Sequence, residues 1–286
     1  MTIAISLKVH NGVVLAADSA STLEAQTSEG KKSVVNIFNT ARKIFNLYKN
    51  EPIGFVGWGL GSIGPASIST LCKDLRRRFM CIEAGHPDYV LDKDNYTLQH
   101  VANLARKYFF EEKYVTEGLS QITPKPPSMG FIVAGYSSGE NLAEEWQITI
   151  KEGKCPEPEL VRPKDETGIT WAGEREVIHR LFSGYGTELP NVLAELGAPS
   201  DQIPKIMDII ESRLAMHWIS PPMPIKDAID LAKFLAEATI MFSRFTPGPP
   251  TVGGPVDVAA ITKHEGFKWV GRKLWYPAEL NPKEGV

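Results

Sequence analysis

Hydrophobic and polar residues alternate at the start of the chain. Residues 3–9 place four branched apolar side chains on one face, with smaller or polar side chains on the other. The dipeptide Asn11-Gly12 follows, and then an unbroken apolar run at 13–17. Two β-favouring segments on either side of Asn-Gly are a strong hairpin signal, because the tight turn needs positive φ at its central residues. The pattern therefore predicts a hairpin whose second strand ends at Asp18.

Further along, apolar residues recur every three or four positions in some segments and form short continuous runs in others. The first pattern is typical of helices that cover a core, and the second of buried strands. Residues 19–40 are polar and poorly periodic, which predicts a loop region with room for short strands. Strands are predicted at 43–47, 53–56, 129–136, 145–150, 256–262 and 267–271, and helices at 64–84, 98–114, 174–183, 201–217 and 225–242.

Strands in consecutive hairpins, with helices grouped between them, favour antiparallel sheets covered by helices. We expect an α+β fold, a four-layer α-β-β-α sandwich of two antiparallel sheets. The 286 residues fit one large domain or two small ones. We interpret residues 1–286 as one domain with added segments near 27–40, 153–170 and 187–222. The last of these overlaps a stretch in which several Pro and Gly residues surround one predicted helix.

The composition excludes several classes of protein. The chain is 43% hydrophobic and 23% charged, as in globular proteins with a sizeable core. Its net charge of −3, with both signs interspersed, argues against nucleic acid as the main partner, because phosphates require a clustered basic face. The sequence lacks an apolar run of about 18 residues and a basic, apolar leader. Three cysteines without metal-ligand spacing suit a reducing compartment. We expect a cytoplasmic protein without membrane contact, cofactor or metal.

Thr2 follows the initiator methionine directly, and methionine is normally removed when the next residue is small. Removal would expose a residue that carries both a hydroxyl and a free α-amine. The amine has a pKa of about 7.7–8.0 in peptides, so a useful fraction is neutral at cellular pH. It can take the hydroxyl proton directly or through a water, which makes Thr2 a nucleophile and its base in one residue.

Such a site also needs a cation, a carboxylate that fixes the cation, and backbone N–H groups for the oxyanion. Asp18, after the second predicted strand, and Lys43, at the start of the third, can supply the pair. The glycine-rich stretch Gly57-Trp58-Gly59 can bring backbone N–H groups close to a substrate because no Cβ intervenes, and Ser19 can support the amine. Structural explanations stay open: a strand-end turn for Asp18 and Ser19, a surface lysine for Lys43, and the tight start of a helix for Gly57 and Gly59.

The segment TIAISLKVHNGVVLAADS resembles the start of proteasome β subunits and of the bacterial HslV peptidase, which are N-terminal nucleophile (Ntn) hydrolases. The shared pattern is Thr2, Lys8 in the first strand, Gly12 in the turn, and an apolar strand that ends in Asp18-Ser19, sixteen residues after the threonine. The resemblance covers the first nineteen residues most closely and continues in pieces through the chain.

The family's lysine precedes a short strand, as Lys43 does here. Matching it requires about ten extra residues in the preceding loop, so Lys31 and Lys32 are alternatives. The family's oxyanion glycine occupies the place of Gly57. The catalytic set that the resemblance implies is Thr2, Asp18, Ser19, Lys43 and Gly57.

Two features depart from the family pattern. Where the family carries Gly-Ser-Gly, this chain reads Trp171-Ala172-Gly173, without a hydroxyl. Where the family carries a late Asp, no carboxylate precedes Gly253-Gly254 in the Pro-rich segment. Glu174 and Asp257 are candidate replacements. These departures and the chain length make the sequence more similar to outlying bacterial proteasome-like families, such as Anbu, than to the standard subunits.

The resemblance implies a threonine peptidase that cleaves peptides or unfolded proteins through an acyl-enzyme ester. It also implies self-assembly into rings or stacked oligomers, and it leaves an ATPase partner open. Two alternatives remain. One is a catalytically silent ring or scaffold subunit, which the departures favour, and the other is a hydrolase of small-molecule amides.

Overall fold

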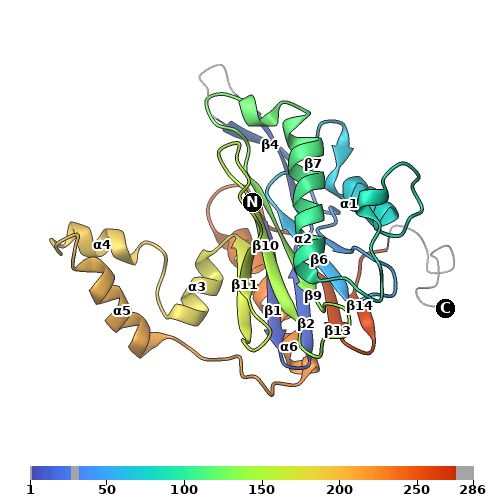
Figure 1. Ribbon diagram of the computed structural model, residues 1–286. Helices are drawn as coiled ribbons and strands as arrows, with labels where there is room; N and C mark the ends of the chain where they lie inside the picture. The colour runs from blue at the N-terminus through green and yellow to red at the C-terminus, as the bar shows by residue number, and fades with distance from the viewer. Residues whose placement is uncertain (1, 27–31, 275–286) are drawn as a thin grey trace.

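The computed structural model describes residues 2–26 and 32–274, and two five-stranded antiparallel sheets form its centre (Figure 1). Sheet I contains, in spatial order, β12 (Gly168–Gly173), β1 (Ile3–Val9), β2 (Gly12–Ala17), β13 (Asp257–Thr262) and β14 (Gly266–Gly271). Sheet II contains β11 (Glu159–Arg162), β10 (Glu144–Ile150), β9 (Met129–Gly135), β6 (Ile53–Trp58) and β5 (Ile44–Asn46). The hairpin predicted at the amino terminus is present as β1 and β2, which pair with Leu7 opposite Val14.

Helices cover the outer face of each sheet. They are α1 (Ile68–Phe79), α2 (Leu98–Arg106) with its π-helical continuation η2 (Lys107–Val115), α3 (Glu176–Ser183) and α6 (Ile225–Phe245). Leu75 of α1 and Val101 of α2 are buried against sheet II, and Leu235 of α6 is buried against sheet I. Between the sheets, Leu15 and Ile132 belong to a third apolar cluster. The layers are therefore helix, sheet, sheet and helix, and the predicted four-layer α-β-β-α sandwich is confirmed.

The first helix is shorter than predicted. The side chain of Ser67 accepts the Thr70 N–H at 3.1 Å, which caps the amino end of α1. The residues before it form a small hairpin, β7 (Ser62–Ile63) and β8 (Ala66–Ser67), instead of a first helical turn. The apolar periodicity could not locate this boundary, because a capping serine also fits within a polar helix face.

Two edge strands were missed from the sequence. The segment near 153–170 contains β11 and the start of β12, which close one edge of each sheet. Most residues of β12 are half-buried, so the strand lacks the strong apolar pattern of a central strand. Because β12 pairs with β1, it still contributes directly to the surroundings of Thr2.

Further elements lie outside the four layers. They are the hairpin β3 (Ser21–Gln26) and β4 (Lys32–Phe38), the helices α4 (Leu189–Glu195) and α5 (Ile203–Leu214), and the single turns η1 (Pro87–Tyr89) and η3 (Leu119–Gln121). The α4–α5 pair projects from the body (Figure 1), and none of its described helical residues is buried. The sequence predicted one helix here where there are two. Residues 27–31 of the predicted added segment 27–40 lie outside the described residues.

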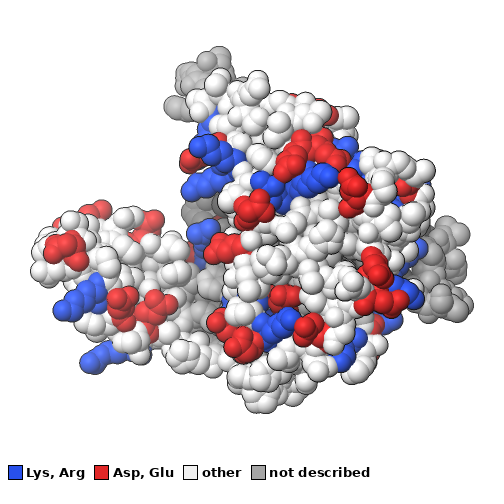
Figure 2. All heavy atoms as spheres, in the orientation of Figure 1, with Lys and Arg blue, Asp and Glu red and all other residues white. Residues whose placement is uncertain are grey.

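The surface carries both signs of charge. On the face shown in Figure 2, Lys and Arg lie in mixed groups with Asp and Glu, separated by uncharged areas. Within the described ranges, no helix has the length and apolar content required to cross a membrane.

Candidate active site

Thr2 and Asp18 meet because the first two strands form a tight hairpin. Ala4 pairs with Ala17 across β1 and β2, so the residues just outside the ladder face each other. The Thr2 hydroxyl donates to Asp18 Oδ1 at 2.6 Å, and the Ile3 N–H donates to the same oxygen at 3.0 Å. The spacing of sixteen residues thus follows from two strands of matching length joined by a short turn.

Asp18 is fully buried, and in the described part of the chain five groups form hydrogen bonds with its carboxyl oxygens, each of them as the donor. Its second oxygen, Oδ2, accepts the N–H groups of Ala20 at 3.0 Å and Gly253 at 3.1 Å. These bonds fix the orientation of the carboxyl group, and Oδ1 remains directed at Thr2 and Lys43. An anion held in this way fits the role of anchoring a neighbouring cation.

Lys43 supplies that cation. Its Nζ donates to Thr2 Oγ1 and, at 2.5 Å, to Asp18 Oδ1. The side chain is only 12% exposed, and this burial lowers the pKa of Lys43 from its ordinary value; the charge of Asp18 opposes the shift. Of the two alternative lysines, Lys32 lies in β4 and Lys31 lies outside the described residues. The structure therefore brings Thr2, Asp18 and Lys43 into mutual contact.

Ser19 takes part in a neighbouring network. Its hydroxyl donates to Pro255 O at 2.5 Å and accepts from Lys273 Nζ at 2.7 Å, while Lys273 forms a buried ion pair with Asp257. In the described part of the chain, no hydrogen bond joins Ser19 to Thr2. Asp257 thus lies behind the site through Lys273, a residue that sequence reasoning missed. Burial lowers the pKa of Lys273, and the carboxylate of Asp257 opposes that shift.

Glu174 forms a hydrogen bond with Thr2 through its backbone. Its N–H donates to Thr2 O at 2.7 Å, which continues the pairing of β1 with β12. Its carboxylate accepts the Glu176 N–H at 3.2 Å at the start of α3. Of the two candidate replacements, Glu174 therefore holds the backbone of Thr2, and Asp257 is linked to Ser19.

The Gly57 N–H, expected to bind an oxyanion, is already engaged. It donates to the carbonyl of Lys43 at 2.9 Å and so extends the ladder between β5 and β6. Two residues on, Gly59 lies beyond the end of β6, and its N–H has no acceptor among the described residues. Gly59 has φ +90°, and a Cβ there would lie 2.5 Å from Ser128 O, so only glycine fits. The donor free to contact a ligand at this place is Gly59, not Gly57.

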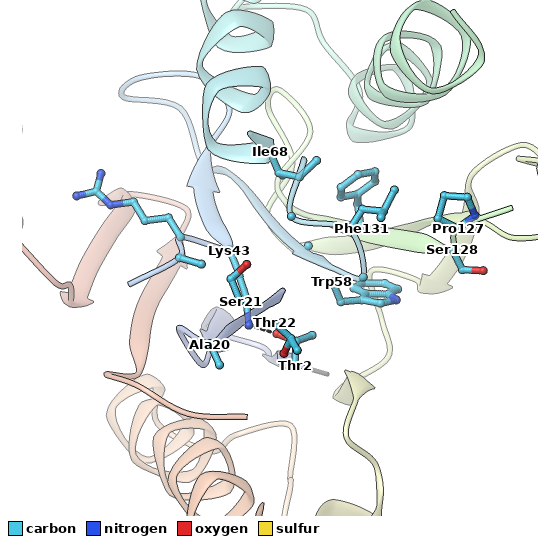
Figure 3. Close-up of a pocket in the computed structure, with 16 residues that line it drawn as sticks. Thr2, Ala20, Ser21, Thr22, Lys43, Trp58, Ile68, Pro127, Ser128 and Phe131 are labelled. Carbon is cyan, nitrogen blue, oxygen red and sulfur yellow. Dashed lines mark hydrogen bonds between the residues drawn. The ribbon is translucent and has the colours of Figure 1, made fainter. Parts of the chain in front are cut away.

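Thr2 lies between two cavities of about 400 Å³ each. The one on the Lys43 side, the Lys43 cavity, includes Ile68 and Phe131 (Figure 3). The one on the side of β12, the Arg175 cavity, includes Gly173 and Arg175. Thr2, Trp58, Gly59 and Ser128 line both, so the threonine hydroxyl stands where one extended ligand can occupy both cavities at once.

Comparisons with known proteins concern the fold. No protein-family model matches the chain, and no curated protein matches its sequence. Among solved structures, the chain is similar to a Gly-1 mutant of Anbu from Hyphomicrobium sp. strain MC1, with 16% identity over 96% of this chain and 86% of that chain and a TM-score of 0.47. A second structure of Anbu from the same organism has 16% identity over 94% of this chain and 87% of that chain, with a TM-score of 0.44.

Proposed function

We propose that this protein is an N-terminal threonine peptidase of the Ntn-hydrolase type. The observation that carries the proposal is the contact of Thr2 Oγ1 with both Lys43 Nζ and Asp18 Oδ1, at the boundary of two cavities. A buried hydroxyl between a cation and a carboxylate, and open to a ligand-sized space, is the arrangement of an activated nucleophile.

The proposed reaction begins with removal of Met1, which frees the α-amine of Thr2. Thr2 Oγ1 attacks the substrate carbonyl carbon and its proton passes to the α-amine. The charge of Lys43 stabilises the developing alkoxide, and Asp18 holds Lys43 in place. The Gly59 N–H is the proposed donor to the oxyanion.

The tetrahedral intermediate then collapses. The C–N bond breaks, the α-amine gives its proton to the leaving nitrogen, and an ester of Thr2 remains. Water attacks this ester with the amine as base, and Thr2 Oγ1 is released with its proton restored.

The proposal includes self-assembly into a ring or stacked oligomer, in keeping with the sequence resemblance. The described surface contains apolar side chains that an assembly would cover, among them Leu196, 79% exposed, after α4 and Ile209, 52% exposed, in α5. Light scattering of the purified chain measures whether its mass exceeds that of one chain.

Intact-protein mass spectrometry with an epoxyketone peptide tests the nucleophile. This electrophile requires both a hydroxyl and a free amine on the same terminal residue. The expected result is a mass without Met1, a single covalent adduct, and fragment ions that place the adduct on Thr2. A mass that retains Met1, together with no adduct, would contradict the peptidase and favour the silent subunit, because an acylated nitrogen cannot act as the base.

A second prediction concerns Gly173, which packs against the nucleophile. Gly173 has φ +96°, and a Cβ there would lie 1.8 Å from the carbonyl oxygen of Thr2. Gly173→Ala is therefore expected to displace Thr2 and lower kcat/KM by roughly 10²-fold, since displacements of about 1 Å have effects of this size. Peptide turnover and thermal unfolding are the measurements.

Gly197→Ala is the matched control for backbone strain. Gly197 has φ +88°, and nothing lies within 4 Å of its added Cβ. Gly197→Ala should lose about as much stability from the positive φ as Gly173→Ala does from its own positive φ, on the order of 1 kcal/mol. It should retain turnover. Equal turnover in the two variants would contradict the placement of Gly173 against Thr2.

A further inference from the structure

The Arg175 cavity contains two charged side chains, and both are cations. Lys151 follows the end of β10, and Arg175 immediately precedes α3. Both residues are exposed, and within the described ranges neither side chain has a hydrogen bond or an ion pair. The cavity therefore offers positive charge beside Thr2 that the protein itself does not neutralise.

The neighbouring acids are directed elsewhere. The carboxylate of Glu174 accepts the N–H of Glu176, and the carboxylate of Glu176 binds Arg180 and Thr187. Neither acid lines the Arg175 cavity. An anion that enters this space consequently meets two cationic side chains without competition from a lining carboxylate.

The register of β1 and β12 shows on which side of the nucleophile this cavity lies. Ile3 pairs with Gly173, and the Glu174 N–H donates to the carbonyl of Thr2 at 2.7 Å. The strands are antiparallel, so the next residue, Arg175, lies toward the backbone nitrogen of Thr2. Lys43 contacts the hydroxyl of Thr2 instead. The Arg175 cavity is thus on the amino side of the nucleophile.

This position assigns the cavity to one part of the substrate. In the proposed reaction the α-amine of Thr2 delivers a proton to the leaving nitrogen, so the leaving segment must lie on the amino side. The Lys43 cavity then holds the acyl part, and the Arg175 cavity holds the residues after the scissile bond.

We propose that Lys151 and Arg175 bind a carboxylate in the leaving segment of the substrate. An arginine fork and a lysine ammonium are the side chains that bind carboxylates most directly. The carboxylate has two sources, an acidic side chain directly after the scissile bond or the free C-terminus of a short leaving segment. This inference rests on the proposed peptidase for its assignment to the leaving side.

Binding to the full chain carrying Thr2→Ala tests the proposal without turnover. The probes are four fluorescein-labelled peptides with Leu before the scissile bond, because the Lys43 cavity contains Ile68 and Phe131. They carry Glu or Gln after that bond and end two residues later in a carboxylate or a carboxamide. Two comparisons result, Glu against Gln and carboxylate against carboxamide. Fluorescence anisotropy should show that the acidic peptide binds more tightly in at least one of them, with a Kd lower by about threefold to fivefold for each cation engaged. The preference should shrink as ionic strength rises, because both cations are exposed.

Charge-matched variants separate this site from general electrostatics. Lys151→Gln and Arg175→Gln, each added to the Thr2→Ala chain, should reduce the preference for the acidic peptide by about threefold to fivefold, and the two changes together should abolish it. Lys268→Gln removes the same charge from an exposed position in β14 that lines neither cavity, and should keep it. The Glu–Gln pair and the carboxylate–carboxamide pair identify the source of the carboxylate.

Two results overturn the inference: equal binding of acidic and neutral peptides, or an equal loss of preference in Lys268→Gln. Turnover of the same peptides by the chain with Thr2 intact distinguishes the two proposals. Cleavage without a preference for acidic peptides supports the proposed peptidase and contradicts the proposed carboxylate site. A binding preference for acidic peptides without cleavage supports a carboxylate site and contradicts the proposed peptidase.

Discussion

Thr2→Ala is expected to lower kcat/KM for peptide cleavage by about 10⁴-fold or more, the usual effect of removing a covalent nucleophile. Alanine also permits removal of Met1, so the α-amine, Lys43 and Asp18 all remain and only the hydroxyl is lost. The measurement is the steady-state turnover of a peptide that the unaltered chain cleaves.

The folded state should survive this change. Asp18 keeps its other four donors when the Thr2 hydroxyl is removed, so the free energy of unfolding should fall by only about 1 kcal/mol. Thr2→Ser is the positive control, because serine retains the hydroxyl and the amine and should retain measurable turnover. Residual activity of Thr2→Ala close to that of Thr2→Ser would exclude Thr2 as the nucleophile.

Lys43→Met is expected to lower kcat/KM by roughly 10²- to 10⁴-fold, because the variant loses the only cation that contacts Thr2 Oγ1 among the described residues. Met keeps much of the length and volume of lysine but leaves Asp18 without its charge partner. For the same reason, the epoxyketone peptide should modify Thr2 more slowly in this variant, and the rate of modification is a second measurement. A variant that reacts at the normal rate would show that Lys43 serves the fold and not the chemistry.

The pH dependence of turnover separates the charge of Lys43 from proton transfer. Burial lowers the pKa of Lys43 below its ordinary value of 10.5, so Lys43 loses its charge at a lower pH than a free lysine. Because the proposed reaction needs the charged form, kcat/KM should decline on the alkaline side below pH 10.5. The rise on the acid side should follow the α-amine, with a pKa of about 7.7–8.0.

Lys43→Arg distinguishes the acid-side rise of kcat/KM from its alkaline-side decline. Arginine keeps its charge at every pH at which turnover can be measured, so the alkaline decline should disappear while the acid-side rise remains at a lower overall rate. Disappearance of the acid-side rise in Lys43→Arg would instead identify neutral Lys43 as the group that takes the proton.

Local sequence determined the parts of the fold and site that depend on neighbouring residues. The Asn-Gly turn and the apolar runs beside it predicted the first hairpin, and a hairpin of fixed length necessarily brings Thr2 next to Asp18. The order of strands and helices predicted the α+β sandwich, because each buried face requires a covering layer. Lys43 was selected from its place before a short strand, and it does contact Thr2. The catalytic roles of these residues stay predictions.

The tertiary structure alone decided which distant groups surround that hairpin. Gly57 was the expected oxyanion donor, but pairing of β5 with β6 engages its N–H, whereas the N–H of Gly59 has no acceptor among residues 2–26 and 32–274. Lys273 reaches Ser19 from 254 positions away, and no local pattern encodes such a contact. Arg175 comes to the amino side of Thr2 only because the half-buried edge strand β12 pairs with β1. Local periodicity reports which face of an element is buried, whereas the partners across a sheet and the ends of its ladders are set by the packing of the whole chain.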